Sequence, residues 1–189
     1  MAASSNVPAG TDRIVVIGAG LAGLFTALKL APQPVTVIAA HRLGRGASSE
    51  WAQAGIAAAV GDGDTIEAHA ADTIRVGRGI ANERLINMMV GEAPDRLEDL
   101  LGLGIPFDRD LEGRLALRRE AAHSARRIVS VQGDMAGRQI MAALISAVRA
   151  APHISFLEGY DAEEIALHDG RAAGVIMRQT RGGSNLREL

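Results

Sequence analysis

Short apolar runs and longer helical patterns alternate at the start of the chain. Residues 13–17 form a β-branched run that predicts a buried strand, and residues 35–38 predict a second one. Between them, residues 21–31 follow a helical pattern that Pro32 and Pro34 end. Two strands joined by a helix in this order are expected to be parallel with a right-handed crossover. The pattern therefore indicates an α/β fold with a parallel sheet.

The middle of the chain reads mainly as helices and loops. Residues 43–49 predict a loop, and the alanine-rich residues 50–60 favour the beginning of a helix. Asp64 or Thr65 is expected to cap a helix that ends near Val76. Asn82 is expected to cap the next helix, on whose apolar face lie Leu85, Ile86, Met89, Val90 and Ala93.

Two further predictions concern helix boundaries. Pro94 should kink or split the helix in which it lies, because an interior proline costs about 3 kcal/mol. The charged residues 107–131 form the least regular part of the chain. Asp134 is then expected to cap an amphipathic helix with one apolar face: Ile140, Met141, Leu144, Ile145 and Val148.

The C-terminal part predicts strands. Residues 154–157 read as a strand, and two further strands flank Asp169 and Gly170, a dipeptide typical of a two-residue hairpin turn. We expect no closing element over residues 181–189. With residues 1–12 as a disordered lead-in, the simplest organisation is one domain over residues 13–189.

Composition narrows the class of protein. The 189-residue chain is 48% hydrophobic and 22% charged, and its formal net charge is −2, which argues against a nucleic acid or an anionic membrane as partner. It has no cysteine, so disulfides and thiolate metal sites are excluded, and no metal site is expected. The apolar residues 14–40 contain glycines, Lys29 and prolines, a pattern that fits a strand–helix–strand unit better than a membrane span. With no secretory signal at the N-terminus, we expect a cytoplasmic protein.

A glycine fingerprint marks the first predicted turn. Gly18, Gly20 and Gly23 have the spacing G-x-G-x-x-G directly after a strand and at the start of a helix. In such a motif the first glycine permits the turn, the second admits a pyrophosphate and the third lets helix and strand pack closely. The motif alone does not separate FAD from NAD, so an ordinary NAD-binding domain is one reading.

One expected partner of the fingerprint is missing. A carboxylate that binds the ribose normally lies at the end of the second strand, about 20 residues after the motif. Ala39, Ala40 and His41 occupy that place. The ribose is therefore held by another group, such as the backbone or His41, and ordinary NAD binding is disfavoured.

Three more segments carry a family resemblance. Residues 48–58, 117–128 and 133–138 follow the fingerprint in collinear order and resemble the L-aspartate oxidase family of the succinate dehydrogenase/fumarate reductase flavoprotein superfamily. The resemblance covers about residues 13–177. It implies a Rossmann-like FAD-binding domain with a parallel central sheet, helices on both faces and a β-hairpin near the C-terminus.

The resemblance also implies how the cofactor is held. Succinate dehydrogenases attach FAD covalently through a histidine, and Ser48 stands at the matching place here, so non-covalent FAD is expected. Residues 19–22 should line the pyrophosphate, residues 48–55 the isoalloxazine, and Asp161 with Ala162 the adenine. Ala54 replaces a usual glycine. The implied cofactor-binding residues are Gly18, Ala19, Gly20, Leu21, Ala22, Gly23, Ser48, Ser49, Glu50, Trp51, Ala52, Gln53, Ala54, Gly55, Asp161 and Ala162.

The activity implied by the resemblance is the FAD-dependent oxidation of L-aspartate to iminosuccinate in de novo NAD biosynthesis. A hydride passes from the α-carbon to the flavin, oxygen or fumarate reoxidises the flavin, and the product suggests a functional link to quinolinate synthase. Glu120 matches the family's residue that orients the substrate ammonium. A dicarboxylate with an amino group needs such an anion and nearby cations, and Arg119, Arg126 and Arg127 are candidates.

Other readings of these residues stay open. The chain is alternatively part of a fumarate reductase-like dicarboxylate flavoprotein, or a truncated FAD-binding remnant without catalysis. From spacing alone Glu120 reads as a surface carboxylate, and the pair Arg126 and Arg127 as solvated or paired with acids. His123 reads as a structural residue, and Trp51, Met88 and Met89 read as core residues.

We expect the 189-residue chain by itself to show no aspartate oxidase turnover. The family's catalytic base is an arginine on a later segment, and a capping domain closes over the substrate; neither has a counterpart before Leu189. An incomplete sheet with an exposed edge should follow. Hydrogen peroxide release, measured on the purified chain loaded with FAD, checks this, and aspartate-dependent peroxide would contradict it.

Overall fold

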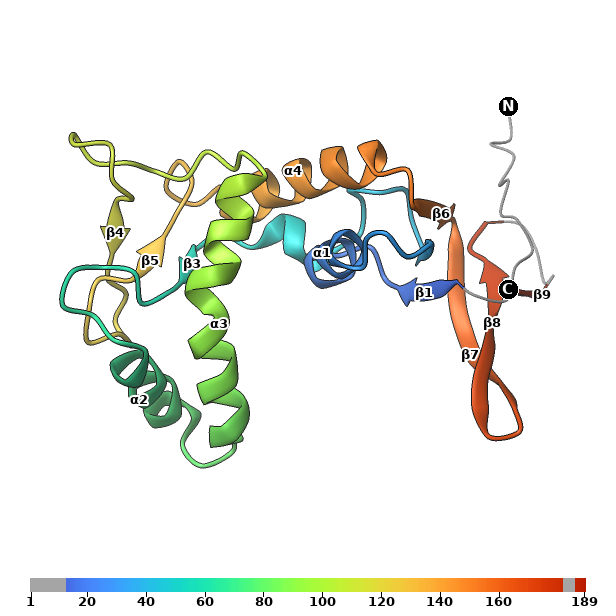
Figure 1. Cartoon of the computed structure of the whole chain (residues 1–189), viewed down its shortest axis with the longest axis horizontal. Coiled ribbons are helices and arrows are strands. Elements are labelled where there is room, and N and C mark those ends of the chain that lie inside the picture. The colour runs from blue at the N-terminus through green and yellow to red at the C-terminus, as the bar shows by residue number, and fades with distance from the viewer. Residues whose placement is uncertain (1–12, 182–185) are drawn as a thin grey trace. The chain divides into compact units, whose positions relative to one another are not determined.

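The computed structural model describes residues 13–181 and 186–189, and the predicted lead-in, residues 1–12, lies outside them. The elements in chain order are shown in Figure 1: β1 (Ile14–Ile17), α1 (Leu21–Lys29), β2 (Val35–Ala39), the 3-10 helix η1 (Ser48–Trp51), β3 (Ile56–Ala57), α2 (Ile66–Gly77), α3 (Glu83–Gly102), β4 (Leu117–Arg118), β5 (Ile128–Val129), α4 (Ala136–Ala150), β6 (Ile154–Glu158), β7 (Tyr160–His168), β8 (Arg171–Gln179) and β9 (Leu186–Glu188). Backbone contacts divide the chain into two compact units, residues 1–50 with 144–189 and residues 51–143.

A parallel sheet forms the centre of the first unit. Its strand order is β1-β2-β6, with Ile14 opposite Val35 and Val35 opposite Ile154. Every residue of β2 is buried, as expected of a central parallel strand. The predicted α/β class with a parallel sheet is confirmed. β1 lies at the edge of this sheet, and Ile17 is 51% exposed there.

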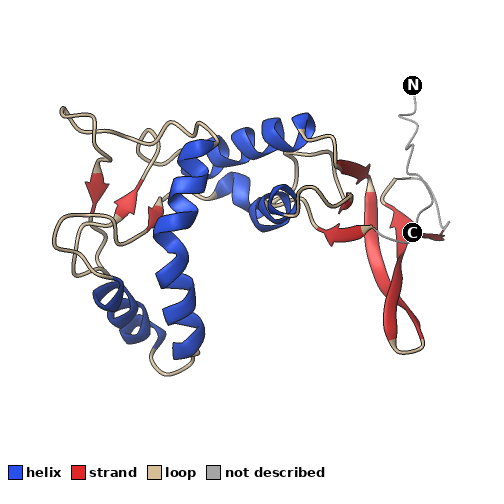
Figure 2. Ribbon diagram, in the orientation of Figure 1, coloured by secondary structure: helices blue, strands red, loops and turns tan. Residues whose placement is uncertain are grey.

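The two faces of this sheet are covered by different kinds of structure. Val16 faces α1, because a Cβ atom added at Gly23 would lie 3.4 Å from its side chain. Val15 points to the opposite face. There it packs against a buried cluster that β8 completes with Val175 and Met177. On this face the antiparallel strands β7 and β8, drawn red in Figure 2, cover the parallel sheet.

The predicted hairpin is confirmed. β7 and β8 pair antiparallel, and Asp169 (φ 50°) and Gly170 (φ 74°) turn the chain between them in the left-handed conformation of a type I′ turn. The expectation that no element follows is wrong, because β9 pairs antiparallel with β8. Three residues are too few to show the alternation by which a strand is predicted.

Two helices dominate the second unit. Thr65 accepts a hydrogen bond from the Ala68 N–H, and Asn82 accepts one from the Leu85 N–H, so both predicted N-caps are confirmed. The helices pack through Ala70, Ile86 and Val90. Pro94 lies inside α3 without splitting it. The buried side chains on both sides of the proline, Val90 and Leu97, offset the hydrogen bond that it removes.

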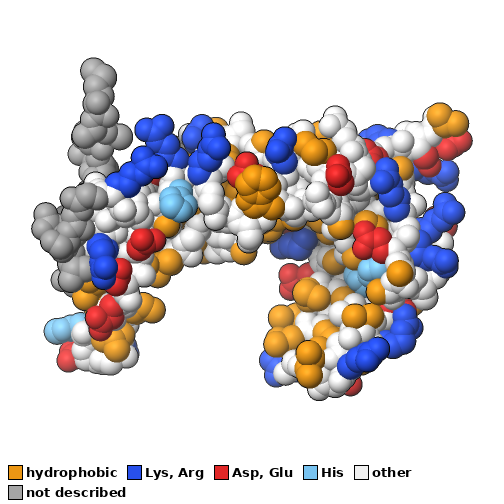
Figure 3. All heavy atoms as spheres, turned by 180° about the vertical axis from the view of Figure 1, so that it is seen from behind, with side chains coloured by type: hydrophobic (Ala, Val, Ile, Leu, Met, Phe, Trp, Pro, Cys, Tyr) orange, Lys and Arg blue, Asp and Glu red, His pale blue; other side chains and the backbone are white. Residues whose placement is uncertain are grey.

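The predicted core stripe of α3 is only partly right. Ile86 and Val90 are buried, whereas Leu85, Met88 and Met89 are 50%, 57% and 59% exposed. The core reading of the two methionines is therefore wrong. Figure 3 shows hydrophobic side chains gathered at the end of the α2–α3 pair where the two helices are joined.

The helix expected to begin in residues 50–60 extends no further than Trp51, where η1 ends. After η1 the chain runs extended as β3, in a small antiparallel sheet of order β3-β5-β4. Gly55 explains the difference, because a Cβ atom at this position would overlap the Val129 carbonyl of β5. A tight backbone approach has thus overridden the helical propensity of the alanines.

The amphipathic helix predicted after Asp134 is present as α4. Its predicted apolar face is buried at Ile140, Met141, Leu144 and Val148. Asp134 is not the residue next to the helix, since Met135 directly precedes Ala136 and the Met135 carbonyl accepts from the Gln139 N–H. Among the described residues, no helix combines the length and apolar character needed to cross a bilayer.

Two helical glycines predict opposite effects of the same substitution. Gly23→Ala places a methyl group against the Gly18 carbonyl, whereas Gly91→Ala meets no atom within 4 Å. We expect the first to lower the free energy of unfolding by about 1–3 kcal/mol. The second should raise it by about 0.5–1 kcal/mol through helix propensity. Thermal or urea unfolding of the two variants measures both, and equal effects would contradict the close approach at Gly23.

Candidate functional site

The turn between β1 and α1 needs two of its three glycines for reasons of backbone geometry. Gly18 has a φ of 103°, a conformation that side chains disfavour, and its N–H donates to the Ile38 carbonyl at 2.9 Å. Gly23 lies so close to Gly18 that no side chain fits between them. The turn is therefore held against the carboxyl end of β2, with the start of α1 directly beside it.

The remaining glycine, Gly20, has a different environment. A Cβ atom there would meet only the Ser49 hydroxyl at 3.4 Å and Ala47 at 3.9 Å, both ordinary contacts. Gly20 is the N-cap of α1 and provides no side-chain cap. Space next to this position, together with first-turn N–H groups that have no acceptor within the helix, suits an anion such as a pyrophosphate.

Ser49 links the second predicted cofactor segment to this turn. Its hydroxyl accepts a hydrogen bond from the Leu21 N–H at 3.2 Å. The N–H groups of Ala22 and Gly23 are the next donors of the helix and have no intrahelical acceptor. Within the first unit, the structure thus brings together residues 18–23 and residues 48–50, as a dinucleotide site requires.

The carboxyl ends of β2 and β6 are tied together beside this turn. The Gly159 N–H donates to the Ala39 carbonyl at 2.8 Å, and the Leu43 N–H donates to Glu158 Oε1 at 2.7 Å. Asp161 and Ala162, the predicted adenine contacts, follow on β7 with exposed side chains. Sequence reasoning did not identify Glu158, although its place directly after the apolar run of a strand is the signal that marks sheet-edge ligands.

The rest of the predicted flavin segment lies in the second unit. Trp51 is 72% exposed, so its reading as a core residue is wrong. The Ala52 carbonyl accepts from the Gly137 N–H at 3.0 Å, which anchors this segment to the beginning of α4. Gln53 and Ala54 are exposed, and Gly55 packs tightly on β5.

Glu120 lies in an exposed turn of the second unit. Its carbonyl accepts from the His123 N–H at 3.0 Å, and its side chain is exposed. Residues that precede and follow Glu120 in the sequence line a pocket of about 650 Å³: Leu117, Arg118, Arg119, Ser124, Ala125 and Arg126. All three arginines of the lining are exposed, and Arg118 is paired with Asp108 at 3.3 Å. The lining is cationic, so an anionic ligand suits it.

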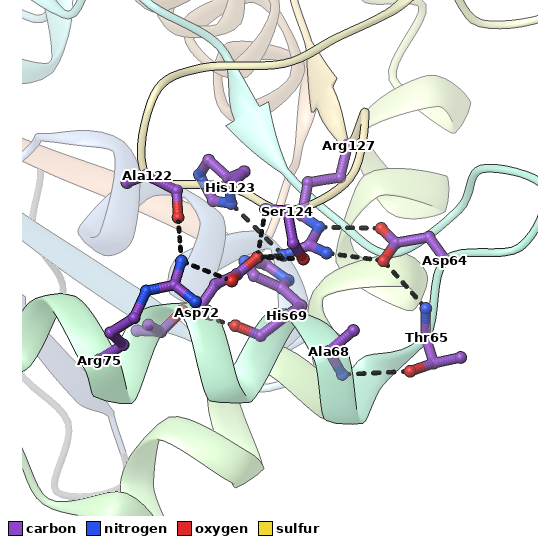
Figure 4. A network of polar contacts seen from close by, with 11 residues as sticks. Asp64, Thr65, Ala68, His69, Asp72, Arg75, Ala122, His123, Ser124 and Arg127 are labelled. Atoms are coloured by element: carbon purple, nitrogen blue, oxygen red, sulfur yellow. Dashed lines mark hydrogen bonds and ion pairs between the residues drawn. The ribbon is translucent and has the colours of Figure 1, made fainter.

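A buried ionic cluster holds this segment on α2 (Figure 4). Arg127 is 0% exposed and binds Asp64 with two hydrogen bonds, from Nε at 2.9 Å and from Nη2 at 2.7 Å. Its Nη1 binds Asp72 at 2.8 Å. Asp72 also accepts from the Ser124 N–H at 2.6 Å and from the Ser124 hydroxyl at 2.7 Å. We call these four residues the Arg127 cluster.

The cluster shifts the ionisation of its members. The Ser124 N–H, together with the Ser124 hydroxyl, Arg75 and Arg127, holds the pKa of the Asp72 carboxyl well below its usual range despite burial. Burial lowers the pKa of nearby His69, and the positive charge of Arg127 adds to this effect. The folded cluster therefore keeps an ionised Asp72 beside a neutral His69.

The cluster shows the environment of two residues, Arg127 and His123, that the sequence left open. Arg127 is paired with acids and is closed to a substrate, which confirms the structural reading for this member of the arginine pair. His123 lies with Nδ1 3.4 Å from Arg127 Nη1, as a structural residue does. Within residues 13–181 and 186–189, no three His, Asp or Glu side chains gather as metal ligands would.

Comparison with known proteins defines the class of protein. The FAD binding domain family matches residues 13–188, and the chain belongs to this family. FAD is accordingly its cofactor, and the glycine turn with the free N–H groups of α1 fits the pyrophosphate of that molecule.

The particular relatives are L-aspartate oxidases. The enzyme of Mesorhizobium japonicum is 46% identical over 162 residues, which cover 86% of this chain and 32% of the relative. The enzyme of Bacillus subtilis is 33% identical over 174 residues, covering 92% and 32%. The predicted resemblance to this family is confirmed, and the chain spans about a third of the length of the curated relatives it matches.

Solved structures agree with the fold. Sdh1 of Mycobacterium smegmatis in complex with UQ1 has a TM-score of 0.82 at 30% identity, covering 93% of this chain and 32% of that one. A quinol-fumarate reductase with menaquinol has a TM-score of 0.84 at 22% identity, covering 95% and 32%. The predicted FAD-binding α/β fold, with its parallel central sheet and its hairpin near the C-terminus, is thereby confirmed.

Asp72→Asn should change how the free energy of unfolding depends on pH. The pKa of Asp72 is lower in the folded than in the unfolded chain, where it is about 3.9. Its stabilisation is therefore fully present above that value and is lost as the pH falls toward the folded pKa. We expect the variant to be about 3 kcal/mol less stable at pH 7, since a buried charge loses its partner. Its further loss below about pH 4 should be shallower than that of the unsubstituted chain.

Urea unfolding between pH 3 and pH 7 measures this difference. Asp95→Asn, at an exposed position of α3, is the matched control and should follow the unsubstituted chain. Parallel acid profiles of the Asp72 variant and the unsubstituted chain would contradict the proposed ionisation.

Proposed function

We propose that this chain is the FAD-binding portion of an L-aspartate oxidase, which oxidises L-aspartate to iminosuccinate for NAD biosynthesis. The observation that carries the proposal is a pocket lined by arginines that flank Glu120 in the sequence, in a chain whose relatives are L-aspartate oxidases. Oxygen or fumarate is the proposed electron acceptor, and quinolinate synthase the proposed consumer of the product. The cytoplasm is the proposed compartment.

The residues of the glycine turn support the cofactor part of the proposal. The first turn of α1 directs N–H groups toward the pyrophosphate, and the open side of Gly20 leaves room for it. Ser48 has no nucleophilic nitrogen, so the flavin is proposed to bind without a covalent bond. When bound, the flavin supplies the chemistry, because it accepts the hydride of the substrate α-carbon.

Charge supports the substrate part. An amino dicarboxylate carries two negative groups and one positive group. Arg119 and Arg126 are exposed cations of the pocket lining and suit the carboxylates, while Glu120 suits the ammonium. The Arg127 cluster anchors the chain at Ser124 and Arg127, on either side of Arg126. A dicarboxylate without an amino group gains nothing from Glu120, and this difference separates an aspartate oxidase from a fumarate reductase-like enzyme.

Glu120→Gln tests this assignment in the protein expressed from its complete gene. We expect the KM for L-aspartate to rise about tenfold or more, because a charge-assisted hydrogen bond to the ammonium is lost. FAD affinity should stay unchanged. Anaerobic bleaching of the flavin absorbance by added L-aspartate measures the reaction, and flavin fluorescence measures cofactor binding.

Glu112→Gln, also exposed, is the matched control and should leave the KM unchanged. Bleaching by succinate but not by aspartate would favour the fumarate reductase-like enzyme. Bound FAD that neither compound bleaches would favour a non-catalytic FAD-binding protein.

A further inference from the structure

The candidate cofactor site has no carboxylate at the end of β2 to bind the ribose of a dinucleotide. The ribose of the adenosine half usually donates a hydroxyl hydrogen bond to a carboxylate at the end of the second parallel strand. In this chain β2 ends at Ala39, and Ala40 follows. Neither side chain can accept a hydrogen bond, so the acceptor must come from another element or from the backbone.

The neighbouring strand carries a carboxylate at the same level of the sheet. Glu158 is the last residue of β6 and stands in register with Ala39 of β2. Adjacent strands lie about 4.8 Å apart. A side chain from the end of β6 therefore reaches the same edge of the sheet at which a carboxylate on β2 would lie.

The direction of the Glu158 side chain brings it toward β2. Its Oε1 accepts the Leu43 N–H at 2.7 Å, and Leu43 belongs to the segment that leaves β2. The Gly159 N–H donates to the Ala39 carbonyl, so the chain just after Glu158 is also held at this edge. A carboxylate offers about four acceptor sites, and the Leu43 bond uses one of them. Among the described residues, Oε2 of this exposed side chain has no hydrogen-bond partner.

His41 is the competing candidate from the sequence. A Cβ atom at Gly46 would overlap the His41 ring, so the imidazole is packed against its own loop. An ionised carboxylate is also the stronger acceptor for a hydroxyl donor. The contacts therefore favour Glu158 over His41.

We propose that Glu158 binds a ribose hydroxyl of the adenosine half of FAD, so that β6 supplies the carboxylate that β2 lacks. This proposal rests on the assignment of FAD as cofactor. In this role, the hydrogen bond from the Leu43 N–H orients the Glu158 carboxylate. The alternative is that Glu158 only supports the loop after β2 and does not touch the ligand.

Two nucleotides that differ only in their ribose hydroxyls separate these roles. ADP and 2′,3′-dideoxy-ADP are titrated calorimetrically into the purified full chain and into Glu158→Gln. Glutamine keeps an oxygen for the Leu43 N–H but replaces the other acceptor by a donor. We expect the unsubstituted chain to prefer ADP about tenfold or more, and the variant to lose most of this preference.

The outcomes decide between the roles. A variant that keeps the full preference for ADP overturns the proposal, whether or not both affinities fall. Glu164→Gln, at an exposed position of β7, is the matched control and should keep both affinities. Circular dichroism confirms the fold of each variant, and Glu158→Ala gives a second measurement of the same ratio.

The FAD assignment fails in a different way from the role of Glu158. If the unsubstituted chain binds neither FAD nor ADP, the cofactor assignment fails and the proposal fails with it. If it binds both nucleotides equally, or the preference survives at Glu158→Gln, FAD binding stands and the role of Glu158 alone is overturned.

Discussion

The pairing of β2 with β1 on one side and with β6 on the other is the constraint on which the candidate cofactor site depends. Because all three strands are parallel, their carboxyl ends lie at one edge. The Gly18 N–H bonds to β2 there, and so does the Gly159 N–H. Backbone hydrogen bonds thus gather the glycine turn, the acidic end of β6 and the start of β7 at this edge. Side chains then only need to provide space or charge.

In the second unit a buried ion pair, and not a parallel sheet, positions the segment that carries the pocket. An ion pair buried as deeply as that of Arg127 with Asp64 and Asp72 adds little net stability, since desolvation opposes the attraction of the charges. The ion pair instead fixes the conformation of the segment after Glu120, because the bidentate bonds of Arg127 and the hydrogen bonds of Ser124 permit one arrangement. The buried Arg127 thus holds the chain directly after Arg126, whose own side chain is exposed.

Local signals predicted much of this structure. The N-caps Thr65 and Asn82 and the turn at Asp169 and Gly170 depend on neighbours in the sequence, so they were predictable. The extended path at Gly55, the exposure of Met88 and the strand β9 depend on partners that lie far away in the sequence. Glycine spacing and the family resemblance gave the cofactor segments. The sequence did not distinguish the buried Arg127 from the exposed Arg126. The acids that pair with Arg127 lie more than 50 residues away in the sequence.

The Arg127 cluster also bears on how the chain reaches its native state. Its bonds close loops of 55 and 63 residues, so chain entropy opposes them until α2 and the segment after Glu120 have both formed. Contacts of this range belong to the later stages of folding, when local helices already exist. In a protein without cysteine, the cluster therefore acts as a non-covalent cross-link between distant parts of the sequence, added after the elements it joins.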